Sequence, residues 1–443
     1  MAGVYDPPYP IPYNPIQGTT SAPAGVMTVY NVKDNGAYGD GVHDDTAAIQ
    51  AALTAANGAG GTVWFPPGTY LMSGITFLDL TKVTFAGVYG ASTIKLSQLA
   101  TQFQIYGAQH VRFEGLSFDQ AGFDASSIIT DTNAVDVVSH NCQFLNCMGA
   151  AFFTANANGG AFTPGIMADK LRFDNNVVIA SSSQVRDLVV LMSNNGKARG
   201  NHINSYGGNA LALYEADASL AASNSIHLNG AGGIGINIAS STRSAATGNT
   251  VYGSTSDKCY SVGQEQDNGS SARSQTDALF AGNVASITPG ATNAPSAYKL
   301  FNASSGTIIN GGSCVGVHEV IYNDGTNDAT IEGVQVVSMV SSFVNNAYGT
   351  YTLAIRNCPG YNPVGSAVPG TAFALPASGT AWTNNTGVDG TLFVTAAGTV
   401  TDVVVQGVTV GSSLAVGQSF FVPAGGTFTL TYSAAPTLVF VGN

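Results

Sequence analysis

Two carboxylate side chains, Asp217 and Glu265, stand at equivalent places in a repeating pattern of asparagines. Each lies sixteen residues after an asparagine, Asn201 and Asn249 respectively, and Ser240 has the same offset within the repeat between them. If the repeats stack as rungs roughly 4.8 Å apart, the two carboxylates lie roughly 9.6 Å apart along the axis. That value is near the upper limit, about 9.5 Å, for a carboxylate pair that cleaves a glycosidic bond with inversion. The spacing therefore predicts a catalytic acid–base pair.

Three further charged residues lie within three positions of this column, namely Glu215, Arg243 and Asp267. A guanidinium such as that of Arg243 would keep one carboxylate ionised while a less solvated partner stays protonated, which is the division of roles that acid–base catalysis needs. The alternative is that all five are ordinary charged residues in the turns of a repeat fold.

Tyrosines on the same repeats are candidates for binding a sugar, because an aromatic ring can stack on a sugar ring while its hydroxyl stays hydrated. Packing within the protein is the alternative for each of them. The substrate-binding candidates are Tyr214, Tyr252 and Tyr260, and weaker candidates for which a structural role is expected are Tyr206, His202, His227, Asp119, Asp124, Asp131 and Asp136.

The elements that must position these residues repeat from about residue 110 to 337. Asparagines followed by short apolar strands recur at Asn176, Asn201, Asn224, Asn249 and Asn283, at intervals of 25, 23, 25 and 34 residues. Such periods indicate the coils of a β-solenoid. Stacked asparagines at one turn are expected to bond to the next rung. The longest interval carries an insertion, Gly263–Gln275, which is expected to form the lip of a binding face.

The segment 30–74 predicts a capped helix followed by a strand. Asp44 and Asp45 precede Thr46, and apolar residues then recur at helical spacing up to Asn57. This pattern predicts an N-capped amphipathic helix over 46–57. A strand is predicted over Thr62–Phe65. A solenoid must cover its terminal rung, and the helix is expected to do so.

The same segment resembles the opening of pectate-lyase-like β-helix proteins, through Gly39-Asp40-Gly41, Asp44-Asp45-Thr46, Ala48-Ile49-Gln50 and Gly68-Thr69-Tyr70. The resemblance implies an all-β fold, a right-handed parallel β-helix with an N-terminal capping helix, over 28–358. A Pro/Tyr-rich extended arm is expected over 1–27. A small C-terminal β-sandwich-like module is expected over 359–443, with strands at 391–396, 400–405 and 427–432.

Members of this family that cleave glycans do so as lyases, with an Arg or Lys base and often calcium, or as hydrolases with two or three carboxylates. This chain lacks the RxPxxR pattern of the lyases, and it lacks the paired Asp, Gly-His and Arg-x-Lys blocks of the polygalacturonase-like hydrolases. Enzymatic activity is therefore left open. No cofactor or metal is predicted, except calcium if the chain is a lyase.

The composition of the chain limits the classes of partner that it is expected to bind. Only 9% of the residues are charged, and 14 basic against 26 acidic residues give a net charge of −12. This balance argues against nucleic acid and against an anionic membrane surface, and favours a neutral or mixed-charge polysaccharide. No leader and no run of about 18 apolar residues is evident, so no membrane insertion is expected. The five cysteines are expected to be buried small hydrophobes, with a Cys142–Cys147 bridge as the alternative.

Three functions remain open from the sequence. The favoured one is a phage tailspike-like surface adhesin, extracellular or virion-associated and homotrimeric, that binds and in some cases depolymerises a polysaccharide. The alternative is a stand-alone secreted glycoside hydrolase or polysaccharide lyase, acting on a bacterial or plant polysaccharide. The third is a structural β-helix with no role in glycan recognition.

Overall fold

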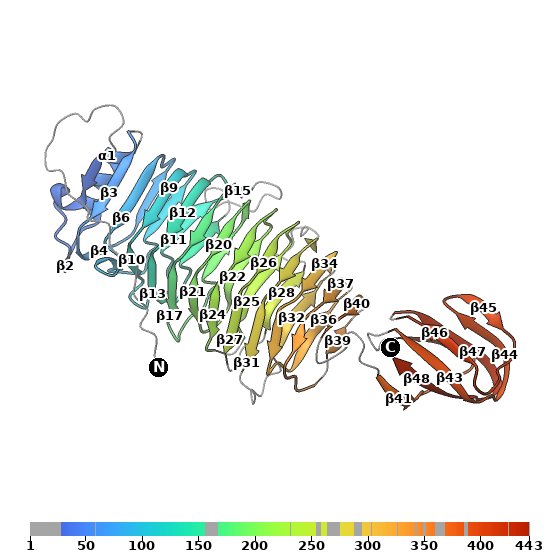
Figure 1. Ribbon diagram of the computed structural model, residues 1–443. Coiled ribbons are helices and arrows are strands. Elements are labelled where there is room, and N and C mark those ends of the chain that lie inside the picture. The colour runs from blue at the N-terminus through green and yellow to red at the C-terminus, as the bar shows by residue number, and fades with distance from the viewer. Residues whose placement is uncertain are drawn as a thin grey trace.

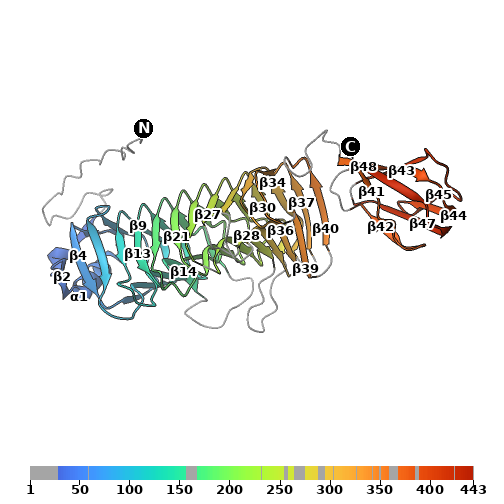
Figure 2. The ribbon, with the colours of Figure 1, turned by 90° about the horizontal axis from the view of Figure 1, so that it is seen from below.

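The computed structural model describes residues 28–57, 59–155, 167–230, 232–253, 258–263, 275–287, 295–302, 304–325, 327–341, 343–348, 351–358, 368–384, 389–423 and 425–442. From Val29 to Arg356 the chain winds into a right-handed parallel solenoid, in which each turn contributes one strand to each of three long sheets (Figure 1). Figure 2 shows the strands of successive turns stacked along one axis. The predicted fold class is confirmed.

The first sheet has 15 strands in the described part of the chain, all parallel. Its strands are β1 (Val29–Asn31), β3 (Gly61–Phe65), β6 (Val83–Gly87), β9 (Gln109–Glu114), β12 (Val135–His140), β15 (Ala168–Asp169), β16 (Arg172–Asp174), β19 (Ser193–Asn194), β20 (Lys197–Arg199), β23 (Leu220–Ala222), β26 (Ala245–Thr247), β30 (Leu279–Ala281), β34 (Thr307–Asn310), β37 (Asn327–Glu332) and β40 (Tyr351–Arg356).

The second sheet has 12 strands among the described residues. They are β2 (Asp40–Asp44), β4 (Gly68–Met72), β7 (Ser92–Leu96), β10 (Ser117–Asp119), β13 (Gln143–Cys147), β17 (Val177–Ala180), β21 (His202–Ser205), β24 (Ser225–Leu228), β27 (Thr250–Gly253), β31 (Val284–Ile287), β35 (Ser313–Val315) and β38 (Gln335–Val336).

The third sheet has 11 described strands. They are β5 (Ile75–Leu78), β8 (Phe103–Tyr106), β11 (Ile128–Asp131), β14 (Phe152–Ala155), β18 (Val189–Leu191), β22 (Asn209–Tyr214), β25 (Ile234–Ala239), β28 (Lys258–Gly263), β32 (Ser296–Phe301), β36 (Glu319–Asp324) and β39 (Val344–Tyr348). A short pair, β29 (Gln275–Thr276) with β33 (Ser304–Ser305), lies outside the three long sheets.

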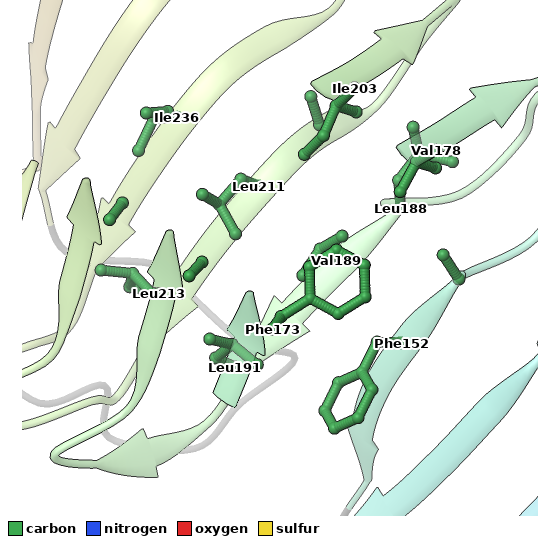
Figure 3. Packing of buried hydrophobic residues seen from close by; sticks show 14 of the residues in the cluster. Phe152, Phe173, Val178, Leu188, Val189, Leu191, Ile203, Leu211, Leu213 and Ile236 are labelled. Carbon is green, nitrogen blue, oxygen red and sulfur yellow. The ribbon is translucent and has the colours of Figure 1, made fainter. Parts of the chain in front are cut away.

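Inside the solenoid, residues at the same position of successive rungs stack into apolar columns. Val189, Leu211 and Ile236 pair across β18, β22 and β25, and all three are fully buried (Figure 3). Val178 and Ile203 extend the core from the second sheet. Because each rung is buried between its two neighbours, only the ends of the stack expose core side chains.

The predicted asparagine ladder is present at the turn between the first and second sheets. The backbone N–H of Asn201 donates to Asn224 Oδ1 at 3.0 Å, and that of Asn224 donates to Asn249 Oδ1 at 2.9 Å. Asn176 and Asn283 continue the ladder at both ends. The side-chain amides of Asn201, Asn224 and Asn249 also donate to a carbonyl of an earlier rung, which gives buried backbone groups near the tight corner a partner.

The capping helix is α1 (Thr46–Ala56), preceded by a short 3₁₀ helix, η1 (Val32–Asn35). Its residues Ile49 and Leu53 are fully buried, and the helix contacts β1 and β3. The N-cap residue, Asp45, makes no side-chain capping bond, so the predicted N-cap is corrected in this detail. Asp44 accepts the Thr46 N–H at 2.9 Å, whereas the Asp45 carboxylate turns back and accepts the N–H groups of Tyr38 and Gly39.

All five cysteines are buried in the solenoid, as the sequence predicted. Cys142 and Cys147 are separate thiols, so the alternative of a bridge between them is wrong. Burial raises the pKa of the Cys142 thiol to about 12 and raises that of Cys147 further. Both side chains therefore act as small neutral core residues.

The C-terminal module consists of two antiparallel sheets of four strands each within the described residues. Both contribute to one core, separate from that of the solenoid, with Val394 and Phe440 from one sheet and Val403 and Phe428 from the other. The predicted sandwich is present. Its strands are β41 (Val368–Ala372), β48 (Thr437–Gly442), β43 (Gly390–Ala396) and β46 (Ser419–Val422) in one sheet, and β42 (Ala381–Thr383), β47 (Thr427–Ala434), β44 (Thr399–Val405) and β45 (Val408–Gly411) in the other.

The predicted arm, residues 1–27, lies outside the described residues, and the predicted boundary at 358/359 coincides with the start of another undescribed segment, 359–367. None of the helices described here has the length and apolar character needed to cross a membrane.

Candidate functional site

The register of the third sheet decides which of the predicted residues share a column. Tyr214 pairs with Ala239, and the Glu215 N–H donates to the Ala239 carbonyl, so Glu215 lies beside Ser240. Asp217 instead pairs with Thr242. The expected alignment of Asp217 with Ser240 is therefore wrong. The linker between the second-sheet strand and the third-sheet strand is two residues longer in the repeat that begins at Asn224 than in the repeat before it. Residues with the same offset from their asparagine are therefore displaced by two positions on the third sheet.

The remaining predicted catalytic residues differ in their surroundings, and two of them lie outside the described residues. Glu265 and Asp267 lie in 264–274, outside the described residues. Arg243 is exposed at a left-handed backbone position, φ 55°. Asp217 is half-buried, and its Oδ1 accepts the Thr242 N–H at 3.2 Å, which ties one turn to the next. The catalytic roles of these residues remain predictions.

The three tyrosines predicted to bind substrate have three different environments. Tyr260 is fully buried and donates to the Asn249 carbonyl at 3.0 Å across the core, so its expected role in stacking on sugar is wrong. Burial raises its pKa well above the usual value. Tyr252 lies on the outer face of the second sheet, stacked on His227 at 4.6 Å. Tyr214 lies on the outer face of the third sheet.

Tyr214 is at the centre of a hydrogen-bonded cluster. Its hydroxyl donates to Asp187 Oδ2 at 3.1 Å and accepts from the amide groups of Asn209 and Asn237. Asp187 is held in place because its two carboxylate oxygens also accept the Asn209 N–H at 2.7 Å and the Asn209 amide at 2.9 Å. A phenol and an ionisable carboxyl are thus fixed within proton-transfer distance.

Three buried oxygen atoms on neighbouring strands of the same face have no hydrogen-bond partner among the described residues. They are Asn209 Oδ1 on β22, Asn237 Oδ1 on β25 and Ser261 Oγ on β28. Asn237 and Ser261 pair directly across β25 and β28, and they are 3% and 1% exposed. A buried polar atom without a partner costs about 1–3 kcal/mol, so a donor that reached these oxygens would be favoured.

The same edge of the third sheet carries a charged group further along the solenoid. Ile234, Lys258, Ser296 and Glu319 occupy one register position on four consecutive strands. Lys258 Nζ donates to Ser296 Oγ at 3.0 Å, and Ser296 donates to Glu319 Oε1 at 2.6 Å. Lys258 Nζ also lies 4.5 Å from the ring centroid of Tyr322. This face therefore combines hydroxyl, amide, cationic and aromatic groups over five strands.

The sequence pattern indicated Tyr214 but not the residues that surround it. Asp187, Asn209, Asn237 and Ser261 are not in the asparagine-based column. A signal was nonetheless present, because Asn237 is a polar residue within the apolar run of β25, IGINIA. A polar side chain that is buried within an apolar strand needs a hydrogen-bond partner or a ligand.

The weaker aspartate candidates have partners within the fold. Burial would raise the pKa of Asp136, but hydrogen bonds from His110 and Arg172 outweigh burial and lower it. The hydrogen bond from Arg186 lowers the pKa of Asp124. Asp119 accepts the Asn146 amide at 2.8 Å, and Asp131 accepts the Gly107 N–H at 2.9 Å. Among the residues that the structure describes, no group of three or more His, Cys, Asp or Glu side chains could hold a metal ion.

Comparison with known proteins gives short matches to curated relatives. The chain is 70% identical over 46 residues to mannuronan C5-epimerase AlgE1 of Azotobacter vinelandii, which is 10% of this chain and 3% of that protein. It is 57% identical over 53 residues to plasmin and fibronectin-binding protein A of Streptococcus pneumoniae strain ATCC BAA-255 / R6, 12% of this chain and 7% of that protein. The chain thus matches less than a tenth of the length of each of these relatives.

Two solved structures are similar to this chain at low identity. The catalytic unit of a GH87 α-1,3-glucanase from Streptomyces thermodiastaticus strain HF3-3 matches with a TM-score of 0.48 and 17% identity, over 75% of this chain and 68% of that one. The Dettilon tailspike protein matches with a TM-score of 0.47 and 13% identity, over 93% and 94% of the two chains.

A family model covers more of the chain than any of these sequence matches. The model described as rhamnogalacturonase A/epimerase, pectate lyase-like, matches residues 29–275, which is more than half of the sequence. The matched region includes the capping helix, the asparagine ladder up to Asn249 and the Tyr214 cluster. The chain belongs to the rhamnogalacturonase A/epimerase family of pectate lyase-like β-helix proteins.

Proposed function

We propose that this protein binds a polysaccharide along the outer face of the third sheet, centred on the Tyr214 cluster. The observation that carries the proposal is a set of three buried oxygens on adjacent strands, those of Asn209, Asn237 and Ser261, which have no hydrogen-bond partner among the described residues. Sugar hydroxyls would supply the missing donors after a small side-chain movement uncovers these oxygens. The family description, which names a glycan-cleaving enzyme and an epimerase, supports a carbohydrate ligand.

Catalysis on the bound glycan is the second part of the proposal. The Tyr214 hydroxyl and the Asp187 carboxylate, 3.1 Å apart, would act as an acid–base pair on a sugar held against β22 and β25. The competing arrangement is the one expected from the sequence, with Asp217, Glu265, Glu215 and Asp267 as the carboxylates and Arg243 tuning them. Calcium would be expected only if the reaction is a lyase reaction.

The biological setting is also proposed. A tailspike-like adhesin, extracellular or virion-associated and homotrimeric, accounts for a long solenoid with a separate C-terminal module. A stand-alone secreted hydrolase or lyase is the alternative. Gene neighbourhood separates them, because tail and baseplate genes accompany the first and sugar transporters the second.

The test uses the full chain on a panel of bacterial surface glycans and plant polysaccharides, with binding, reducing-end and unsaturated-product readouts. Tyr214→Phe keeps the ring and removes the hydroxyl, and we expect it to lower turnover at least tenfold on any glycan that is processed. Asn237→Ala should weaken binding by a similar factor. The double variant Asp217→Asn, Glu265→Gln tests the competing carboxylates in the same binding and turnover assays.

Two results would contradict this assignment. If the double variant alone abolishes turnover while Tyr214→Phe retains it, the catalytic carboxylates are those expected from the sequence. If Asn237→Ala binds every glycan as well as the parent does, the third sheet is not the binding face. Thermal melting of each variant checks that the fold is intact.

A further inference from the structure

The outer face of the second sheet carries a ring stack that the proposed site on the third sheet does not use. Asn204, His227, Tyr252, Ser286 and Val315 occupy one register position on five consecutive strands, from β21 to β35. All five point outward, because Ile226, Val251 and Ala285, the buried residues next to the middle three, line the core. The position therefore forms an outward column on the solenoid.

Within this column the two rings lie one above the other. The centroids of His227 and Tyr252 are 4.6 Å apart and the rings are 11° from parallel. This separation matches the distance between rungs, roughly 4.8 Å. The faces of both rings are therefore directed along the solenoid axis, and a further ring would extend the stack by one rung on either side.

The stack stops at Ser286, which occupies the next rung after Tyr252. A serine side chain is too short to cover the second face of the phenol, and no other ring among the described residues stacks on that face. Beyond Ser286 the column continues with the half-buried Val315. The space above Ser286 thus has an aromatic face on one side and an aliphatic side chain on the other.

The surroundings indicate what would fit there. The neighbouring outward column contains Thr250, Val284 and Ser313, which add two hydroxyl groups. None of the strands β24, β27, β31 and β35 carries Asp, Glu, Lys or Arg. An aromatic face with hydroxyl neighbours and no formal charge fits the apolar face and the hydroxyl groups of an uncharged pyranose.

We propose that Tyr252 forms a second saccharide subsite, in which a pyranose ring of a neutral glycan stacks on the phenol above Ser286. The subsite rests on the proposed polysaccharide binding but lies on a different sheet from the Tyr214 cluster. A chain of sugars that contacts both faces would gain affinity through two linked contacts.

The experiment measures the affinity of the full chain for cellohexaose, laminarihexaose and maltohexaose by titration calorimetry, with an oligogalacturonate as the acidic comparison. Tyr252→Ala should raise the Kd for a neutral hexasaccharide about tenfold, and Tyr252→Phe should leave it within about twofold. Ser286→Tyr should also raise the Kd about tenfold, because the new ring would occupy the space of the sugar. Ser225→Tyr, which adds a ring in the neighbouring column on the same face, is the matched control and should bind as the parent does.

The outcomes separate this subsite from the first site. Weaker binding in Tyr252→Ala and Ser286→Tyr, with normal binding in Ser225→Tyr, supports the subsite even if Asn237→Ala has no effect. Binding that falls only in Asn237→Ala supports the third sheet and overturns the subsite. The subsite is also overturned if no neutral hexasaccharide binds, or if only the oligogalacturonate depends on Tyr252.

Discussion

At the scale of single residues, the direction of a side chain decides its chemistry. Tyr214 and Tyr260 lie two strands apart in the same sheet. Tyr214 points outward and bonds to Asp187, whereas Tyr260 points inward and stacks on Tyr298 in the core at 5.1 Å. The same residue type is thus a candidate for proton transfer at one position and a core residue at the other.

The buried thiols give a prediction about alkaline pH. The pKa of Cys142 is about 12 in the folded chain and 9.0 for an ordinary thiol. The unfolded chain therefore releases this proton first as the pH rises. The stabilisation due to the neutral thiol is complete below about pH 9 and declines as the pH approaches 12.

We therefore expect the parent to lose about 1.5 kcal/mol more unfolding free energy between pH 8 and pH 10 than Cys142→Ala does. Urea denaturation at both pH values measures the difference. Val178→Ala, which truncates a buried residue that does not ionise, is the control and should lose as much as the parent over this range. Equal losses in the parent and Cys142→Ala would show that the thiol ionises as readily in the folded chain as in the unfolded one.

At the scale of elements, the asparagine ladder adds side-chain hydrogen bonds between rungs at the turn from the first sheet to the second. The Asn224 side chain accepts from the Asn201 backbone and amide, and it donates to the Ala198 carbonyl at 3.0 Å. These partners are buried, so water cannot replace the lost bonds easily.

Asn224→Ala is expected to reduce the free energy of unfolding by about 3 kcal/mol, since it leaves at least two buried groups without partners. Chemical denaturation followed by circular dichroism measures the loss. Asn133→Ala is the matched control, because Asn133 is exposed and its amide donates to Asp131 at 3.4 Å as its one side-chain bond among the described residues. A change of less than about 0.5 kcal/mol is expected there. A loss in Asn224→Ala as small as in the control would mean that the ladder does not stabilise the solenoid.

The helix α1 acts at the same scale by covering the first rung. Its buried residues, Ile49 and Leu53 among them, close the apolar interior at the N-terminal end of the solenoid. At the other end, β40 is the last described strand of the first sheet, and the C-terminal module follows after segment 359–367.

At the scale of the whole molecule, the C-terminal module presents an apolar surface with almost no charge. Between residues 360 and 443 the charged residues are Asp389 and Asp402. Phe393 on β43 and Phe421 on β46 are 40% and 55% exposed on one face of a sheet. A surface of this kind tends to associate unless a partner covers it.

We propose that a homotrimer buries this face, because closed symmetry covers an apolar surface without open-ended polymerisation. Light scattering behind a sizing column should give three times the chain mass of 45.1 kDa. The double variant Phe393→Ser, Phe421→Ser and deletion of residues 360–443 should both lower the mass, whereas Val408→Ser, on the other sheet, should not. A parent protein that elutes with the mass of one chain would rule the trimer out.

The sequence by itself determined the solenoid, its capping helix, the asparagine ladder and the strands of the C-terminal module. Each of these rests on local signals that recur along the chain, such as Asn201, Asn224 and Asn249 in successive turns, or the alternation within β43 and β47. Such signals survive small changes in repeat length, because every rung is built in the same way.

The candidate site depended on the tertiary structure. Two extra residues before β25 were enough to move Asp217 out of line with Ser240 and to place Glu215 there instead. Asn209 and Tyr214 lie on β22, Asn237 lies on β25 and Asp187 lies in the turn before β18, and only the register brings them together. A register is set by the packing of whole rungs, and a shift of one residue along a strand turns a side chain to the opposite face. The spacing of residues along the chain could not determine it.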